Sequence, residues 1–209
     1  MILSRRFFIT CTLSGLCFAV TRRFGGVATA QTGAQSALAA PHVRVDLFRG
    51  LANVFSRGMD TLADRLNRQG YRARVHSTNG WRSVVTQIAS GYSRGQRDIV
   101  VLIGHSLGAN ATIQAADELN QQNIPVALIV TFDPTQPRQV PRNVLSLVNF
   151  YQNNGFGRRL SAGPGFQGEL TNINLTADRN LSHTTIDEAP RLHGQIIRQI
   201  TNIVNQRSR

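Results

Sequence analysis

A short, purely apolar run, Ile99–Ile103, constrains the fold of this chain more than any other feature. A strand that is apolar at consecutive positions must be buried on both faces, which is typical of parallel sheets covered by helices. The run ends at Gly104, and Leu107–Asn120 then has the spacing of a helix. The segment therefore predicts a central parallel strand that turns sharply into a helix.

The same alternation of strand and helix patterns extends over most of the chain. The predicted strands are 42–48, 71–76, 98–103, 126–132, 144–151 and 170–175, and the predicted helices are 59–66, 81–92, 107–120 and 190–204. This order predicts an α/β fold, a three-layer α/β/α sandwich with a mainly parallel sheet of about six strands. The glycine-rich stretch 152–169 is long for a connection and is interpreted as a lid or binding loop.

The first thirty residues are set apart from the fold. Arg5 and Arg6 precede an apolar run, and small residues at Ala28 and Ala30 suit cleavage before Gln31. The apolar run is shorter than the roughly 20 residues of a membrane-spanning helix, so no stable membrane span is expected. We therefore predict a signal peptide at 1–30, similar to a twin-arginine signal, a linker at 31–41 and one domain at 42–209. Such a protein is periplasmic or secreted.

Composition excludes several kinds of chemistry. All 23 basic residues are arginine, so Schiff bases, P-loop lysines and Ser-Lys dyads are absent. Both cysteines, Cys11 and Cys17, lie in the predicted signal, and no metal-ligand spacing occurs, so neither a metal nor another cofactor is expected. The chain has a formal charge of +12, but its arginines form no cluster with interleaved aromatic residues. No nucleic-acid partner is therefore expected. The oligomeric state is left open.

The turn after the central strand carries the pattern Gly-x-Ser-x-Gly. It reads Gly104-His105-Ser106-Leu107-Gly108 and lies between a buried strand and a helix, the setting of a nucleophile elbow. The two glycines let strand and helix approach closely, and the helix N-terminus favours developing negative charge. Ser106 is therefore the predicted nucleophile, and the side chain of His105 is expected to point away from it.

On this motif the chain resembles compact lipase-like and thioesterase-like members of the α/β-hydrolase superfamily. The resemblance implies a Ser, acid, His order. Asp133 follows the strand after the nucleophile's helix and is the preferred acid, with Asp178 as the alternative. His183 precedes the last helix and is the preferred base, with His193 as the alternative.

The resemblance also implies an oxyanion hole. One donor is the backbone N–H of Leu107, and the second, in the loop after the first strand, is assigned to Leu51. Many relatives have His-Gly in that loop, whereas this chain has Arg49-Gly50. The predicted activity is that of an exported serine hydrolase that cleaves a small or lipid-like ester or thioester through an acyl-enzyme. The alternatives are an amidase with the same triad and a non-catalytic envelope binding protein.

Overall fold

The computed structural model describes residues 42–51 and 57–207. Within them a six-stranded sheet, with strand order β2-β1-β3-β4-β6-β8 and parallel pairing, forms the centre. Its strands are β1 Val43–Phe48, β2 Arg72–His76, β3 Ile99–His105, β4 Leu128–Phe132, β6 Ser146–Tyr151 and β8 Glu169–Asn174. The predicted fold class is confirmed. The predicted signal peptide and linker lie outside the described residues.

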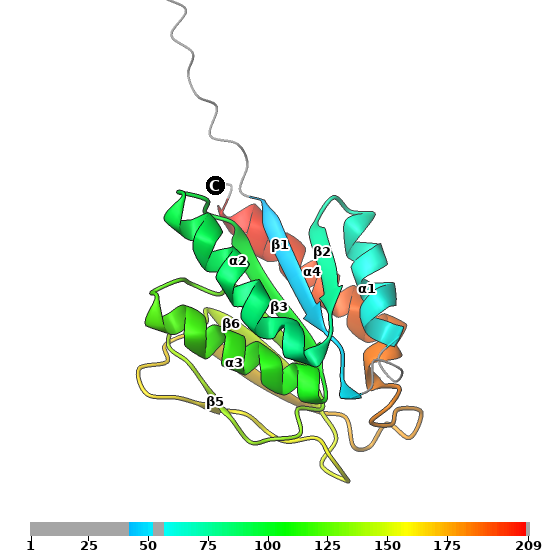
Figure 1. Ribbon diagram of the computed structural model, residues 1–209. Coiled ribbons are helices and arrows are strands. Elements are labelled where there is room, and N and C mark those ends of the chain that lie inside the picture. Colours follow the sequence, from blue (N-terminus) through cyan, green and yellow to red (C-terminus); the bar gives the residue numbers. More distant parts are fainter. Residues whose placement is uncertain (1–41, 52–56, 208–209) are drawn as a thin grey trace, which may run out of the picture. The chain divides into compact units, whose positions relative to one another are not determined.

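Helices cover both faces of this sheet (Figure 1). They are α1 Arg57–Asn67, α2 Trp81–Ser93, α3 Leu107–Gln121 and α4 Pro190–Arg207. The buried side chains of α1 and α4 pack with one face of the sheet, and those of α2 and α3 pack with the other. The molecule therefore has two apolar layers, one on each side of the sheet.

Strand β3 contributes to both layers. Val101 and Ile103 pack toward α1 and α4, whereas Val100 and Leu102 pack toward α2 and α3. All four side chains are buried. Burial on both faces explains why this strand is apolar at consecutive positions.

The register of β3 and β4 places two loops side by side. His105 pairs with Phe132, and each residue is the last of its strand. Ser106 and Asp133 therefore leave the same edge of the sheet from neighbouring strands. The carboxyl ends of parallel strands are where an open α/β sheet builds its site.

The stretch 152–169, expected as a loop, contains a short strand. This strand, β7 Ser161–Ala162, pairs in parallel with β5 Gln139–Val140. Strands of two residues are too short to show periodicity, so the sequence did not reveal them.

Side-chain amides attach this stretch to the main sheet. Asn149 Nδ2 donates to the carbonyl of Arg158 at 2.9 Å. The side-chain amide of Asn172 bonds both backbone groups of Leu160, at 3.0 and 3.1 Å. These bonds hold Arg158 and Leu160 against β6 and β8.

Candidate active site

Ser106 occupies a sharp turn between β3 and α3. Its φ of 56° and ψ of −119° lie in a region that non-glycine residues rarely adopt. A Cβ on Gly104 would lie 2.3 Å from the carbonyl oxygen of Gly108, and a Cβ on Gly108 would lie 2.2 Å from that of Phe48. The close approach of α3 to β1 and β3 thus requires both glycines. The turn has the strand–turn–helix geometry predicted from the motif.

Ser106, His183 and Asp133 form a continuous hydrogen-bonded chain. Ser106 Oγ lies 3.0 Å from His183 Nε2, and His183 Nδ1 lies 3.2 Å from Asp133 Oδ2. A carboxylate only accepts, so Nδ1–H donates to Asp133 and Nε2 is left to accept the hydroxyl proton of Ser106. The structure thus brings together the three residues predicted from the sequence, in the arrangement of a Ser-His-Asp triad.

Asp133 is fixed from several sides. Its side chain is only 1% exposed, and Oδ1 accepts the backbone N–H of Gln152 at 2.7 Å. Gly157 packs so closely that a Cβ there would lie 2.3 Å from Oδ1. One carboxylate oxygen is therefore held by the glycine-rich loop while the other faces His183.

His183 lies in the loop between β8 and α4. Its carbonyl accepts a hydrogen bond from His105 Nε2 at 2.7 Å, and the two rings lie 5.1 Å apart. The side chain of His105 is thus directed toward the backbone of His183. Burial lowers the pKa of His105 to about 4, so its ring is neutral at ordinary pH.

The alternative acid and base lie in other environments. Asp178 pairs with Arg191, and hydrogen bonds to the backbone N–H of Asn180 and to Arg191 lower the pKa of Asp178. His193 is buried in α4 and donates from Nε2 to the carbonyl of Asp187 at 2.6 Å. Neither alternative is joined to Ser106, so the geometry favours Asp133 and His183.

The two predicted oxyanion donors border one cavity. Leu107 is the first residue of α3, where backbone N–H groups have no acceptor within the helix. Leu51 follows Arg49 and Gly50. The backbone carbonyl of Arg49 accepts a hydrogen bond from the Thr78 hydroxyl at 2.7 Å. Leu51 is 69% exposed and directly precedes the undescribed residues 52–56. The position of its N–H toward a substrate stays a prediction.

A cavity of about 390 Å³ opens beside Ser106. Its lining, which is mostly apolar in surface, comprises Gly50, Leu51, His105, Ser106, Leu107, Thr135, Phe156, His183 and Thr184. A cavity of this size and character suits an apolar group of a small substrate.

Phe156 is a part of this cavity that the sequence did not indicate. Its ring lies 4.7 Å from that of His183 and is 62% exposed. Arg158 holds the turn that contains Phe156, because its Nη1 donates hydrogen bonds to the carbonyls of Gly155 and Gly157 at 2.7 and 3.0 Å. Phe156 thus lies at the cavity, as expected for part of a binding loop at 152–169. The Arg158 side chain instead makes hydrogen bonds within the loop.

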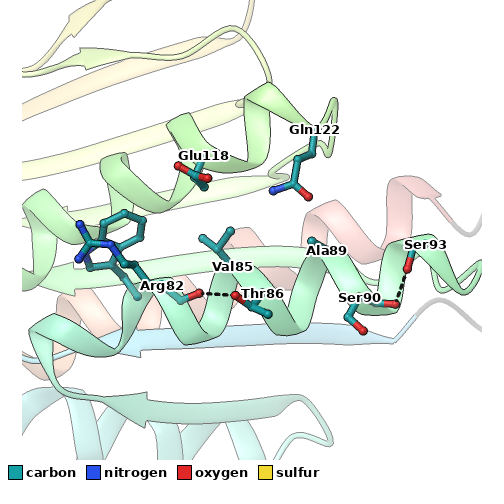
Figure 2. A pocket seen from close by; sticks show the side chains of 9 residues that line it. Arg82, Val85, Thr86, Ala89, Ser90, Ser93, Glu118 and Gln122 are labelled. Carbon is teal, nitrogen blue, oxygen red and sulfur yellow. Dashed lines mark hydrogen bonds between the residues drawn. The ribbon is translucent and has the colours of Figure 1, made fainter.

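A larger hollow of about 630 Å³ lies on the outer side of α2 and α3 (Figure 2). None of the predicted site residues lines it. The hydroxyls of Thr86 and Ser93 donate back to carbonyls of their own helix, at 3.0 and 2.9 Å. Size alone therefore does not identify the site.

Residues 42–51 and 57–207 contain no group of three or more His, Cys, Asp or Glu side chains arranged to hold a metal ion. In the same ranges, none of the helices has the length and apolar character needed to cross a membrane.

Two solved structures are similar to this chain, and the first of them agrees with the fold. A cutinase-like protein from Cryptococcus sp. superposes with a TM-score of 0.52 at 14% identity, over 79% of this chain and 97% of that chain. A protein inferred to be an α/β-superfamily hydrolase, from Xanthomonas campestris pv. campestris, gives a TM-score of 0.42 at 15% identity, over 76% and 99%. No protein-family model and no curated protein matches by sequence.

The parallel sheet, its helical layers and the strained serine turn define the class of protein. This chain has the α/β-hydrolase fold, with a Ser-His-Asp arrangement at the carboxyl ends of the strands.

Proposed function

We propose that this protein is a serine hydrolase that cleaves esters or thioesters through an acyl-enzyme on Ser106. The observation that carries the proposal is the hydrogen-bonded chain from Ser106 Oγ through His183 to Asp133, at 3.0 and 3.2 Å, beside an apolar cavity. A serine hydroxyl is a weak nucleophile unless a neighbouring base accepts its proton.

In the first half of the reaction, Ser106 Oγ attacks the carbonyl carbon of the substrate while its proton passes to His183 Nε2. Asp133 holds the Nδ1–H tautomer and stabilises the imidazolium that forms. The backbone N–H of Leu107, with a second donor from the Leu51 loop, binds the negative oxygen of the tetrahedral intermediate. His183 then returns its proton to the leaving alcohol or thiol as the carbon–heteroatom bond breaks.

In the second half, water hydrolyses the acyl-enzyme. His183 takes a proton from the water, whose oxygen attacks the acyl carbon, and then gives the proton to Ser106 Oγ as the ester bond breaks. Asp133 is held in place for both steps, because its Oδ1 accepts the backbone N–H of Gln152.

The lining of the cavity supports an acyl chain as the group bound beside Ser106. Leu51, Leu107 and Phe156 present apolar surface there, and the uncharged Thr135 and Thr184 also line the cavity. A lipid-like or short-chain acyl ester fits this lining better than a charged group. Export to the periplasm or the medium is part of the same proposal and rests on residues 1–30 alone.

The test is a panel of p-nitrophenyl esters of increasing acyl length. The wild-type protein should turn over esters, Ser106→Ala should lose about 10⁶-fold in kcat, and Asp133→Asn about 10⁴-fold. Asp178→Asn is the matched control and should keep kcat within about twofold. An intact protein that is inert on esters, thioesters and amides would support a non-catalytic binding protein instead, and cleavage of amides alone would support an amidase.

A further inference from the structure

His105, the residue before Ser106, makes a bond that the proposed reaction does not use. It is the last residue of β3, and its side chain is only 2% exposed. Nε2 lies 2.7 Å from the carbonyl oxygen of His183. A carbonyl only accepts, so Nε2 carries the proton and donates it.

Other hydrogen bonds around His183, among the residues that the structure describes, lie mainly within its own loop. Ser182 and Thr185 bond each other within the loop, and Gln152 Nε2 donates to the carbonyl of Leu181 at 3.2 Å. Ser182 and Thr184, on either side of His183, are exposed. The bond from His105 is therefore a direct link between the backbone of His183 and the strand that carries Ser106.

We propose that His105 is a positioning residue, whose Nε2–H holds the His183 carbonyl and thereby places the His183 ring for proton transfer with Ser106. The inference rests on the proposed function, since it concerns the base of the same reaction. Strand β3 then positions both groups of the proton transfer. The turn after it presents Ser106, and the side chain of its last residue, His105, fixes the backbone of His183.

His105 is itself held in a closely packed region. Asp187 Oδ1 lies 3.8 Å from His105 Nδ1, and the Asp187 side chain is fully buried. A Cβ on Gly58 would lie 2.0 Å from the Asp187 carbonyl oxygen, so helix α1 packs directly against this residue. A ring confined in this way has little freedom to turn, and its donor stays directed at the His183 carbonyl.

A matched pair of buried histidines provides the test. His193 also donates from Nε2 to a backbone carbonyl, at 2.6 Å, but the carbonyl belongs to Asp187. His105→Leu and His193→Leu each remove one buried donor, and His105→Gln restores an amide donor at the first position. We would measure kcat and KM on a p-nitrophenyl ester, together with urea unfolding, for all three variants.

His105→Leu should lose about 10²-fold in kcat with KM within about threefold, because a displacement near 1 Å has that effect on a transfer step. His105→Gln should recover about tenfold of the loss, and His193→Leu should lose stability while keeping kcat within about threefold. Equal kcat values for His105→Leu and the wild type would overturn the proposal. So would a His193→Leu variant as slow as His105→Leu.

A second readout is independent of turnover. The proton between His183 Nδ1 and Asp133 should give a downfield NMR signal in the wild type, which persists in His193→Leu and moves upfield or is lost in His105→Leu. An unchanged signal in His105→Leu would overturn the positioning role even if no ester is cleaved. Inert wild-type protein with the expected signal changes would instead contradict the proposed function alone.

Discussion

Gly157→Ala should impair the predicted acid without altering any group of the triad. The added Cβ would lie 2.3 Å from Asp133 Oδ1, and 2.5 and 2.8 Å from the backbone oxygen and nitrogen of Gln152. An ordinary contact needs about 3.4 Å or more, so the loop and the carboxylate must separate by roughly 1 Å. The hydrogen bond from Gln152 N to Asp133 Oδ1, now 2.7 Å, is thereby strained or lost.

The expected loss follows from this displacement. A shift near 1 Å at a catalytic group corresponds to about 10²-fold in kcat. Loss of a hydrogen bond to a charged group and local overpacking together lower the free energy of unfolding by about 2–4 kcal/mol. Both quantities should change, because the same contact holds the loop and the carboxylate.

Gly155→Ala is the matched control on the same loop, since a Cβ there meets nothing within 4 Å. The assay compares kcat on a p-nitrophenyl ester and the urea midpoint for both variants. Gly155→Ala should match the wild type. If Gly157→Ala also matches it in kcat and stability, the packing of Gly157 against Asp133 is not what holds the acid.

Three further predictions concern the surroundings of the triad. Thr78→Val removes the hydroxyl that donates to the Arg49 carbonyl at 2.7 Å, so kcat on an ester should fall about tenfold; an unchanged kcat contradicts a role in the oxyanion loop. Burial raises the pKa of Asp187 from 3.8 to about 7, so the folded protein keeps a proton that the unfolded chain releases, and stability falls as pH rises from about 4 to about 7. Between pH 4.5 and 7.5 the free energy of unfolding of the wild type should fall by about 3 kcal/mol more than that of Asp187→Asn, as measured by urea unfolding. If wild type and Asp187→Asn differ by the same amount at both pH values, the prediction is contradicted. Phe156→Ala removes a cavity wall, so the ratio of kcat/KM for octanoate over acetate esters should fall about tenfold, and a ratio within twofold of the wild type's contradicts that assignment.

Much of the fold follows from local sequence patterns. The apolar run at β3 indicates burial on both faces, and the six long strands and four helices lie within a few residues of their predicted ranges. Strand β4 begins at Leu128 rather than at residue 126, because Val126 makes only an isolated bridge with Val144. Periodicity identifies an element well but locates its ends less sharply, since the ends depend on hydrogen bonds to neighbouring strands.

The three residues of the candidate triad could be predicted for a different reason. Ser106 lies in a motif whose glycines have a steric purpose, and chain order limits the acids and bases to a few residues. Asp133 and His183 then follow from their places after a strand and before a helix. The structure adds the hydrogen bonds that distinguish Asp133 and His183 from the alternatives, Asp178 and His193.

Other parts of the site could not be predicted, because they depend on contacts between distant segments. Phe156 lies beside His183 in a loop whose shape involves hydrogen bonds of Asn149 and Arg158. Asp187 reaches His105 through the packing of α1 against the segment before α4. No local pattern at these residues differs from that of an ordinary loop or helix start.

The most direct test of the central claim is intact-protein mass spectrometry after treatment with a fluorophosphonate, with peptide mapping of the adduct. The wild type should gain a single adduct on Ser106, and Ser106→Ala should gain none, because only a serine activated by a neighbouring base reacts at an appreciable rate. A wild type without an adduct, or an equal adduct on Ser106→Ala, would contradict the assignment of Ser106 as the nucleophile.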